Sequence, residues 1–390
     1  MTVEGSHDRS QNPFAFDRPL EDASALVGRE LELSELARAL KTEADVLVEG
    51  PHRHGKTSLL NAALAAFADG ELGLSVRIDC GGVLTSSDFI RRVEDAYARA
   101  WARGAVEDAL VTRLESLPLR LAGAEANDPA TRAEALLLVA AEAAEPCGSR
   151  AALSFDEVQD ALDIPAIVDV LTRVRERSSD RVTYAFAGPH LSFTEPGLWS
   201  EHAASVTVGP IDPVLFAGEI TRRFADTGRE AGEAAKVIAT VGAGHPQRTS
   251  LLAAQLWTLT PEGQTATVAT ARAAIEQALA RCAPEFDVRW NALHGNERRV
   301  AVAIANDIAP QGTRAQRATG LASFGAAQRA LQGIKASGVA QVRDERTTLT
   351  DPLFAEWLQR RYSQAPAEPN WQALRQQREQ LERGGMTPRL

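Results

Sequence analysis

The chain has 390 residues, more than one hydrophobic core usually organises, so two or three domains are expected. Apolar residues make up 44% and charged residues 24%, which is ordinary for a globular protein, and no apolar run approaches the roughly 20 residues that span a bilayer. The net charge of -10 argues against a protein that coats nucleic acid with its whole surface.

The three cysteines and the N-terminal segment indicate in which cellular compartment the protein is expected. Cys80, Cys147 and Cys282 are widely spaced and form no CxxC pair, so reduced thiols are expected and a zinc site is not. Residues 1–12 are polar and contain no apolar core like that of a signal peptide. We therefore expect a cytoplasmic protein that has no membrane partner.

Charge is distributed unevenly along the chain. Residues 286–390 carry 15 basic and 10 acidic side chains, a net of +5, which leaves a net of -15 for residues 1–285. An acidic body with a mildly basic C-terminal part points weakly to a polyanionic partner, because the arginine content also reflects a general composition bias.

The first part of the chain alternates expected strands and helices. After a polar arm over residues 1–24, the apolar spacing predicts helices over 30–42, 56–67, 88–103, 106–122, 130–144 and 164–177. Short buried strands are predicted over 45–49, 76–79, 151–155, 182–187 and 205–208. This alternation predicts an α/β fold with a parallel sheet covered on both faces.

The second part is predicted to be mainly helical. Helices are expected over 213–282, with a break at 242–246, and then three helices, a hairpin of strands 339–343 and 347–350, and a final helix. We interpret the domains as an N-terminal arm (1–24), an α/β core (25–212), a helical lid (213–284), a winged helix (285–363) and a charged tail (364–390).

A phosphate-binding motif stands between the first expected strand and the following helix. Its residues, Gly50-Pro51-His52-Arg53-His54-Gly55-Lys56-Thr57, match GxxxxGK[ST], and Ser58 follows as part of the same binding segment. Glycines let such a loop point its N–H groups at phosphates, and the helix N-terminus adds a favourable dipole. Lys56 is expected to neutralise the β- and γ-phosphates of ATP, and Thr57 to ligate Mg²⁺. The alternative is a glycine-rich turn without a ligand.

Two acids close the third expected strand of the core. Asp156 is expected to hold Mg²⁺ through water, and Glu157 to act as the general base that polarises the attacking water. Alone, the pair also fits two acids at a helix N-cap, but its position about 100 residues after the P-loop favours the catalytic interpretation. The strand over 182–187 is predicted to lie between the strands that precede these two motifs.

The remaining polar residues near this site leave alternatives open. His52 and His54 are expected to point away from the phosphates while the loop backbone binds them. His190, after the fourth strand, is a candidate γ-phosphate sensor or a solvent-facing residue of a Gly-Pro turn.

Several segments in order resemble one family of ATPases. They are Asn12-Pro13-Phe14, Leu26 to Leu33, the P-loop, Asp156 to Gln159, and Gly244-His245-Pro246. Together they resemble the archaeal-type ATPases of the STAND and origin-recognition-like branches of the AAA+ proteins, over roughly residues 12–362.

The resemblance implies further binding residues and a fold. It implies that Val27, Gly28 and Arg29 lie near the adenine, that Pro246 of the lid contacts the base or ribose, and that a winged helix follows. Without the resemblance, Gly28 to Glu30 also fits a helix N-terminus with an acidic first turn. The sequence departs from the family at Ala187-Gly188, where a Ser, Thr or Arg is often found, which puts the rate of hydrolysis in doubt.

No arginine finger is assigned. Arg175, Arg177, Arg222 and Arg223 fit helix-face positions, and Arg248 is a weak sensor candidate after the lid proline. A homo-oligomer that forms on ATP binding is therefore one hypothesis, because a neighbour would supply the missing arginine.

The C-terminal domain carries a candidate DNA surface. Ser323 is placed to cap a recognition helix with Gln328, Arg329, Gln332 and Lys335, and Arg343 and Arg346 lie near the wing, a set that suits contacts with double-stranded DNA. A solvated charged face, or a winged helix packed on the ATPase core, is the alternative.

Three functional hypotheses follow. The favoured one is an ATP-dependent switch that rearranges its lid and winged helix to control a protein effector supplied in trans. The second is a DNA-binding ATPase of the loader, origin-recognition or transposition-helper type. The third is a nucleotide-binding scaffold that does not hydrolyse ATP.

Overall fold

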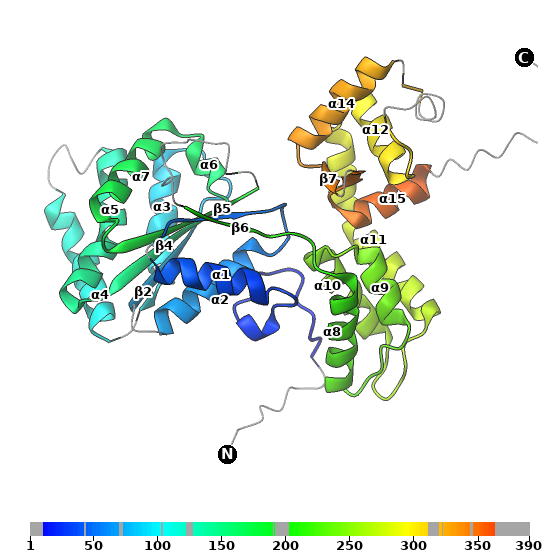
Figure 1. Ribbon diagram of the computed structural model, residues 1–390, viewed down its shortest axis with the longest axis horizontal. Coiled ribbons are helices and arrows are strands. Elements are labelled where there is room, and N and C mark those ends of the chain that lie inside the picture. The colour runs from blue at the N-terminus through cyan, green and yellow to red at the C-terminus, as the bar shows by residue number, and fades with distance from the viewer. Residues whose placement is uncertain are drawn as a thin grey trace, which may run out of the picture. The chain divides into compact units, whose positions relative to one another are not determined.

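The computed structural model describes residues 11–42, 44–69, 73–102, 104–121, 128–189, 191, 203–310, 320–321, 323–343 and 346–362. The chain forms two compact units, Met1–Ala278 and Leu279–Leu390. Helix α11 (Val268–Ala292) runs through the boundary between them (Figure 1).

A central sheet organises the first unit (Figure 1). Among the described residues the strand order is β3-β2-β4-β5-β1-β6, and all pairs are parallel except β2 with β3. The strands are β1 (Val46–Glu49), β2 (Gly73–Asp79), β3 (Trp101–Ala102), β4 (Arg150–Asp156), β5 (Val182–Gly188) and β6 (Ala204–Thr207). Strand β5 lies between β1 and β4, as the sequence predicted, so the carboxyl ends of these three strands meet at one edge.

Helices cover both faces of the sheet (Figure 1). One face packs against α1 (Glu30–Lys41) and α2 (Lys56–Asp69). The other packs against α3 (Ser86–Tyr97), α5 (Pro129–Ala144) and α7 (Pro165–Ser178), and α4 (Ala105–Arg120) packs on α5. The described residues also form the short 3-10 helices η1 (Ala23–Ala25), which packs on α2, and η3 (Glu145–Cys147), which packs on α5.

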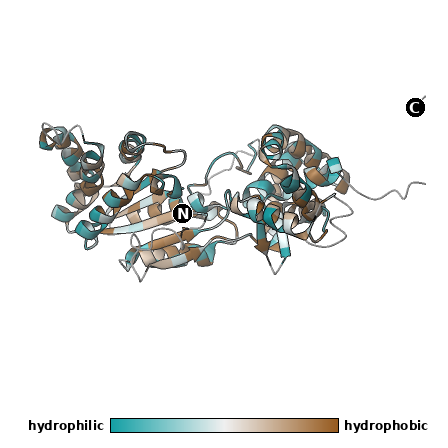
Figure 2. Ribbon diagram, turned by 90° about the horizontal axis from the view of Figure 1, so that it is seen from above, coloured by the Kyte–Doolittle hydropathy of each residue, from teal (hydrophilic) through white to brown (hydrophobic). Residues whose placement is uncertain are grey.

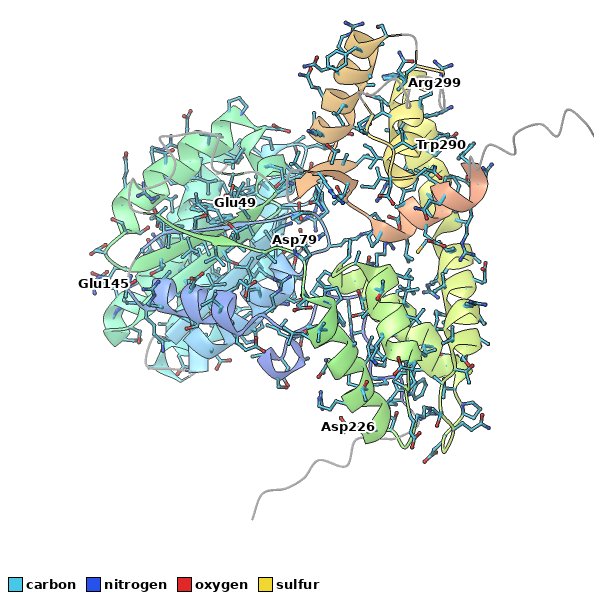
Figure 3. The ribbon with its side chains drawn as sticks, turned by 45° about the vertical axis from the view of Figure 1, so that its right-hand side comes forward. Glu49, Asp79, Glu145, Asp226, Trp290 and Arg299 are labelled. Carbon is cyan, nitrogen blue, oxygen red and sulfur yellow. The ribbon has the colours of Figure 1, made fainter. Side chains whose placement is uncertain are left out.

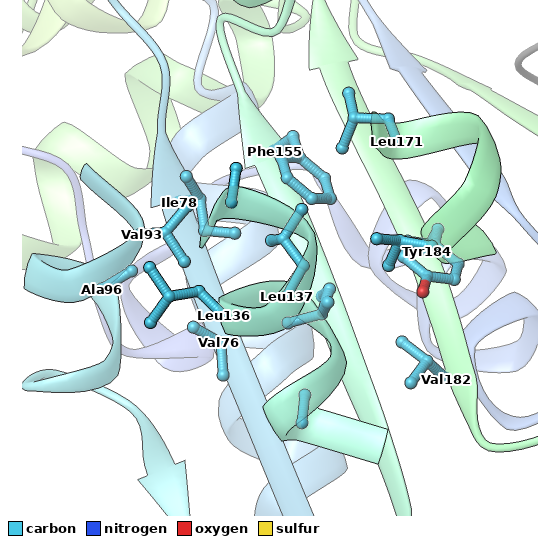
Figure 4. Close-up of a cluster of buried hydrophobic side chains, with 14 of the residues drawn as sticks. Val76, Ile78, Val93, Ala96, Leu136, Leu137, Phe155, Leu171, Val182 and Tyr184 are labelled. Atoms are coloured by element: carbon cyan, nitrogen blue, oxygen red, sulfur yellow. The ribbon is translucent and has the colours of Figure 1, made fainter. Parts of the chain in front are cut away.

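The two faces follow from the alternation of side chains along each strand. On β5, Tyr184 and Phe186 enter the core beneath α3, α5 and α7, whereas Ala185 and Ala187 enter the core beneath α1 and α2. Figure 4 shows Phe155 and Tyr184 in the first of these cores. Figure 2 shows hydrophobic residues concentrated on the strands and hydrophilic residues on the outer helix faces. Burial on both faces explains why the strand sequences are almost continuously apolar.

Local sequence fixes where several helices begin. The side chain of Thr85 accepts a hydrogen bond from the backbone N–H of Asp88 at the start of α3, and Asp128 caps α5 in the same way before Pro129. Asp212 caps α8 (Pro213–Asp226) before Pro213. An oxygen-bearing cap followed by proline satisfies free N–H groups and presets the first helical residue.

Two short elements were not expected. The helix predicted over 88–103 ends at Tyr97, and Trp101–Ala102 instead form strand β3 against Leu74 and Ser75. A short helix, α6 (Gln159–Leu162), follows Glu157. The alanine- and arginine-rich segment has helical propensity, but pairing with the sheet edge overrides it at Trp101.

The lid belongs to the first unit. It contains α8, α9 (Ala234–Gly242), α10 (Pro246–Leu259) and the beginning of α11. The turn between α9 and α10 is tied to the segment after β6, because the N–H of Ile211 donates to the carbonyl of Gly244 at 2.8 Å. Gly244 has φ +77°, and a Cβ there would lie 2.3 Å from the carbonyl oxygen of Ile211, so only glycine permits this approach.

The second unit is helical with one hairpin. Its elements are the end of α11, α12 (Gly295–Ala305), α14 (Phe324–Ala336), β7 (Ala340–Arg343), β8 (Arg346–Leu349) and α15 (Pro352–Tyr362). Ser323 caps α14 as predicted, accepting a hydrogen bond from the N–H of Ala326. The rings of Phe286 and Trp357 pack at 6.0 Å in its core. Of the turn predicted over 344–346, Arg346 instead begins β8, while residues 344–345 and the tail over 364–390 lie outside the described residues.

No described helix combines the length and the apolar character that crossing a bilayer would demand.

Candidate functional site

The P-loop lies where β1 ends and α2 begins. The N–H of Gly50 donates to the carbonyl of Gly188 at the end of β5. A Cβ on Gly50 would lie 2.3 Å from the carbonyl oxygen of Val208, so glycine is required for the loop to pass beside β6. Arg53 has φ +63° and Gly55 φ +94°, and these left-handed residues curl the loop back toward the start of α2.

Lys56 and Thr57 open helix α2 at the carboxyl edge of the sheet. The Lys56 ammonium is buried and donates to the carbonyls of Gly50 at 2.9 Å and Pro51 at 3.2 Å. The Thr57 hydroxyl donates to Oδ2 of Asp156 at 2.6 Å. Residues 99 positions apart in the sequence therefore meet side by side, because β1 and β4 end at the same edge.

Asp156 is the last residue of β4 and Glu157 follows it, and both carboxylates face the P-loop. Oε1 of Glu157 lies 3.7 Å from the Lys56 ammonium nitrogen, and Oε2 lies 3.4 Å from Nδ1 of His52. Glu157 has φ +50°, which is strained for a residue with a side chain. Strain of this kind persists where the surrounding contacts fix it, and here it turns the carboxylate toward the loop.

The charges at this edge are mutually dependent. Burial lowers the pKa of the Lys56 ammonium, whereas the carboxylates of Glu157 and Asp156 act in the opposite direction. Burial raises the pKa of Asp156, although the Thr57 hydrogen bond and the charges of Arg77 and Lys56 oppose it. Burial also opposes ionisation of Glu157, but its contacts with His52, Lys56 and Gln159 outweigh it and lower its pKa to about 2.

This donor set suits a metal-bound polyphosphate. A hydroxyl and a buried carboxylate in contact are the hard oxygen ligands that Mg²⁺ prefers, and a buried carboxylate with a raised pKa gains from a nearby cation. A buried ammonium with a lowered pKa likewise gains from an anion such as phosphate. Among the described residues, no group of three or more metal-binding side chains suggests another metal site.

A pocket lies beside the P-loop, within the first unit. Val27, Arg29 and Gly55 line it from the core, Pro246 from the lid, and Phe14 from the N-terminal arm. All of these segments were singled out from the sequence, although Phe14 was quoted only within a motif. The structure therefore brings the predicted base-binding residues Val27, Arg29 and Pro246 to one place.

Arg29 connects three of the segments around this pocket. Its buried guanidinium donates to the carbonyls of His54 and Gly209, and it pairs with Glu32 at 2.7 Å. Gly28 has φ +57°, so glycine is needed for the chain to turn into Arg29. Arg29 therefore links the P-loop to the segment after β6 and stands at the N-cap of α1, so the helix-start interpretation holds, while its predicted place near the adenine stays a prediction.

The P-loop histidines make contacts that the sequence did not indicate. His54 is buried, and its ring centroid lies 4.6 Å from that of His245, which caps lid helix α10. His52 is more exposed and contacts Glu157. A side chain at a variable position of the motif has no signature, so only the folded structure reveals these contacts.

Further residues reach the site from elements without a recognised motif. Arg77 on β2 lies 3.4 Å from Oδ2 of Asp156. Glu49 and Asp79 close β1 and β2 (Figure 3), and Oε1 of Glu49 accepts the N–H of Leu191 at 2.6 Å. The strand pairing of β2 with β4 places Asp79 opposite Asp156, so a sheet order known in advance would have indicated this set. His190 lies outside the described residues.

Comparisons with known proteins agree with this architecture. No protein-family model matches the sequence, and no curated protein matches it. The structure of a Walker-type ATPase of Pyrococcus abyssi matches with a TM-score of 0.64 and 17% identity, covering 88% of this chain and 99% of that one. The Aeropyrum pernix ORC2 protein, in ADPNP–ADP complexes, matches with a TM-score of 0.60 and 14% identity over 89% of this chain and 95% of that one. At these identities the similarities establish a shared fold, and the predicted α/β architecture with its parallel sheet is confirmed.

Proposed function

We propose that the protein binds ATP with Mg²⁺ at the P-loop and hydrolyses it slowly, as a molecular switch of the STAND and origin-recognition-like type acting in the cytoplasm. One observation carries the proposal: Thr57 donates to Asp156 at 2.6 Å while Lys56 and Glu157 lie 3.7 Å apart at the same edge of the sheet. A general base, a buried ammonium and two oxygen ligands thus converge on one loop that curls as phosphate-binding loops do.

The chain's own residues divide the binding between them. The N–H groups of residues 50–58 and the Lys56 ammonium take the phosphates, and Thr57 and Asp156 hold Mg²⁺. The pocket lined by Val27, Arg29 and Pro246 takes the base and ribose. Bound Mg²⁺ supplies charge neutralisation at the phosphates.

Glu157 is the proposed general base. Its carboxylate contacts both Lys56 and His52. When Lys56 turns to a phosphate, Glu157 loses that partner and becomes available to accept a proton from water. The same residues therefore link occupancy of the loop to readiness of the base.

Contacts between loop and lid support a switch. The P-loop reaches the lid through the rings of His54 and His245, and Arg29 joins the loop to the end of β6. The lid turn is itself bound to Ile211. A change in the loop is therefore transmitted to α10 through packed side chains, and an effector protein in trans would respond to that change.

Calorimetry with ATP and Mg²⁺ tests the binding step. Lys56→Ala should weaken ATP binding by about 100-fold, the equivalent of roughly 3 kcal/mol, because a charge-assisted contact to phosphate is lost. Lys41→Ala, at an exposed position of α1, is the matched control. Equal affinities of wild type and Lys56→Ala would refute the P-loop assignment.

Phosphate release tests the hydrolysis step and separates the switch from a scaffold that only binds ATP. Glu157→Gln should bind ATP with nearly wild-type affinity and release phosphate about 100-fold more slowly, because general base catalysis is removed. Unchanged release would show that Glu157 is not the base, and no release by the wild type would leave only the scaffold.

A second candidate function is binding of double-stranded DNA by the second unit, if that unit is a winged helix. Gln328, Arg329 and Gln332 are exposed together on α14, and Arg346 is exposed at the start of β8. The excess positive charge of residues 286–390 favours this candidate. Fluorescence anisotropy with a labelled duplex should show binding that weakens with salt, and Arg329→Ala should reduce the salt slope by about 1 relative to the control Arg272→Ala. No binding at low salt would remove the candidate.

ATP-dependent homo-oligomerisation remains part of the proposal. The arginine that commonly completes such sites is not assigned in cis, and a second copy would supply one. Light scattering of Glu157→Gln with and without ATP should show a larger particle with ATP, and an unchanged mass would remove this element.

A further inference from the structure

Gln159 lies beside the proposed general base without having a role so far. It is the first residue of α6 and comes two positions after Glu157. Its Nε2 donates to Oε2 of Glu157 at 2.9 Å and lies 3.3 Å from Oδ1 of Asp160. The amide therefore holds the carboxylate from the side of the residue's own segment, whereas His52 and Lys56 hold it from the P-loop.

The other end of the amide points to the end of β5. A Cβ on Gly188 would lie 2.8 Å from Oε1 of Gln159 and 2.7 Å from Cδ2 of Leu191. Both distances are shorter than a Cβ tolerates, so an alanine at position 188 would displace one or both side chains. Gly188 has ordinary strand geometry, which means that the need for glycine here is space and not a positive φ.

Oε1 of Gln159 is buried and has no hydrogen-bond donor among the described residues. A buried carbonyl oxygen left without a donor lowers stability, because it has given up its hydrogen bonds to water. An apolar side chain of similar length would avoid this cost but would leave Glu157 without its donor. The retained amide therefore indicates that holding Glu157 matters more at this position than local stability.

The need for such a donor arises during the proposed reaction. Lys56 is expected to leave Glu157 for a phosphate, and the contact with His52 comes from an exposed side chain of the loop that receives that phosphate. The Gln159 amide belongs to the segment of β4 and α6 and remains in place. It is neutral, so it fixes the direction of the carboxylate without pairing with its charge.

We propose that Gln159 is the positioning residue of Glu157, holding its carboxylate toward the P-loop during hydrolysis, and that Gly188 is a glycine in order to leave room for the Gln159 amide. This inference rests on the proposed ATP hydrolysis by Glu157. It also accounts for Ala187-Gly188 at the end of β5, where the sequence has no polar side chain.

Steady-state kinetics on Gln159 variants tests the inference. Gln159→Met keeps the length of the side chain but removes the donor, and it should lower kcat by about 10- to 100-fold because a misdirected base costs rate steeply. KM and the dissociation constant of a fluorescent ATP analogue should change less than about twofold, since no binding contact is lost. Gln264→Ala, an exposed glutamine outside the site, should behave as wild type.

Gly188→Ala provides an independent arm. In the wild-type background it should lower kcat in the same way, because the new methyl group displaces the amide. In the Gln159→Ala background, where the amide is already gone and only the contact with Leu191 remains, its further effect on kcat should be clearly smaller than in the wild-type background. Non-additivity of this kind in a double-mutant cycle reports direct coupling between the two positions.

The outcomes are separable from those of the proposed function. If the wild type hydrolyses ATP and Glu157→Gln does not, but Gln159→Met retains wild-type kcat, the inference fails and the proposed function stands. A loss of ATP affinity or a lower melting temperature that accounts for the whole effect of Gln159→Met would show a structural role and also overturn it. Absence of hydrolysis by the wild type would overturn both.

Discussion

The residues at the carboxyl edge of the sheet form a set of charges that hold one another in place. Lys56, Asp156 and Glu157 are each buried or half-buried, and each has a pKa displaced from its ordinary value. Displaced pKa values arranged around one loop are typical of functional sites, because burying charge without a purpose costs stability. The hydrogen bond between the Thr57 hydroxyl and Asp156 is the shortest contact in this set. Its two oxygen atoms are the ones that the proposed Mg²⁺ would contact.

Removal of the Thr57 hydroxyl should separate metal binding from nucleotide binding. Thr57→Val keeps the shape of the side chain but removes an oxygen ligand, so we expect the Mg²⁺ concentration required for half-maximal ATP binding to rise about tenfold or more. Thr57→Ser keeps the hydroxyl and should need nearly the wild-type concentration. Calorimetric Mg²⁺ titrations at fixed ATP measure this, and equal requirements in both variants would contradict the assignment of Thr57.

The close packing around Gly50 predicts that a larger residue there would destabilise the fold. A Cβ at this position would lie 2.3 Å from a backbone oxygen of Val208, which cannot move away as a side chain would. We expect Gly50→Ala to lower the free energy of unfolding by about 3 kcal/mol, in the range of overpacked cores. Gly209→Ala is the matched control, because open space surrounds that position and its φ is ordinary. Equal midpoints of urea unfolding in the two variants would be inconsistent with the close approach.

At the residue scale, the sequence predicts what a motif fixes and misses what only the tertiary structure brings together. The P-loop glycines and Thr57 have defined roles because phosphate geometry leaves few solutions. Contacts such as those of Gln159 with Glu157, or His54 with His245, depend on the register of α6 and the packing of the lid. No periodicity or spacing in a single sequence encodes them.

At the scale of elements, the N-terminal arm is bound to the lid. Arg223 of α8 donates to the carbonyls of Pro13 at 2.9 Å and Ala25 at 3.0 Å, and its guanidinium lies 5.7 Å from the ring of Phe14. Asn12 donates to the carbonyl of Ala254 in α10 at 3.0 Å. The arm therefore lines the pocket with Phe14 while being held by two lid helices, contacts that the prediction of a polar lead-in did not indicate.

Glu219 pairs with Arg223, the arginine that binds the N-terminal arm. This ion pair should make the stability of the protein depend on pH. Its carboxylate pairs with Arg222 at 2.7 Å and Arg223 at 2.5 Å; burial opposes ionisation, but these hydrogen bonds outweigh it and lower the pKa of Glu219. Because the folded pKa is lower than the unfolded one, the stabilisation is complete well above about pH 4.5 and is lost as the pH falls through the folded pKa.

We therefore expect Glu219→Gln to lower the free energy of unfolding by about 0.5–1 kcal/mol near neutral pH, a modest value because both arginines also contact solvent. The difference from wild type should shrink as the pH is lowered from about 6 toward 3, since the wild-type carboxylate becomes protonated. Urea unfolding at several pH values measures it. A difference that stays constant over this range would show that the contribution is not ionic.

Element boundaries were predictable where capping residues mark them and not where the sheet edge intervenes. Asp212 before Pro213 and Ser323 before Phe324 mark helix starts that the sequence already indicated. Strand β3 has two residues and pairs with Leu74 and Ser75, so its formation depends on a neighbour about 26 positions away. The local sequence alone favours a longer helix there.

At the scale of the whole molecule, helix α11 is the covalent and structural link between the two units. It runs without interruption from Val268 in the first unit to Ala292 in the second. That alternating strands and helices come first along the chain and a mainly helical part follows was predictable, because each part has its own hydrophobic pattern. Whether both units respond to ATP depends on how cooperatively α11 behaves along its length. Hydrophobic patterning does not encode this property.

Hydrogen exchange along α11 tests whether ATP binding in the first unit alters the second unit. ATP at 100 times its dissociation constant stabilises the binding-competent fold by about 2.7 kcal/mol, so amides of the first unit that exchange by unfolding should slow by up to about 100-fold. A switch requires more than this: the exchange of residues 279–292 and of α15 should also change, by about threefold or more, because part of the binding free energy is then used to rearrange the second unit. Glu157→Gln keeps ATP bound during the measurement. Lys56→Ala at the same ATP concentration is the control: with its roughly 100-fold weaker binding it should be about half saturated, so exchange should slow by no more than about twofold. Protection confined to residues before Leu279 would mean that the second unit does not sense the nucleotide, and the protein would then be an ATPase whose hydrolysis drives only its own lid.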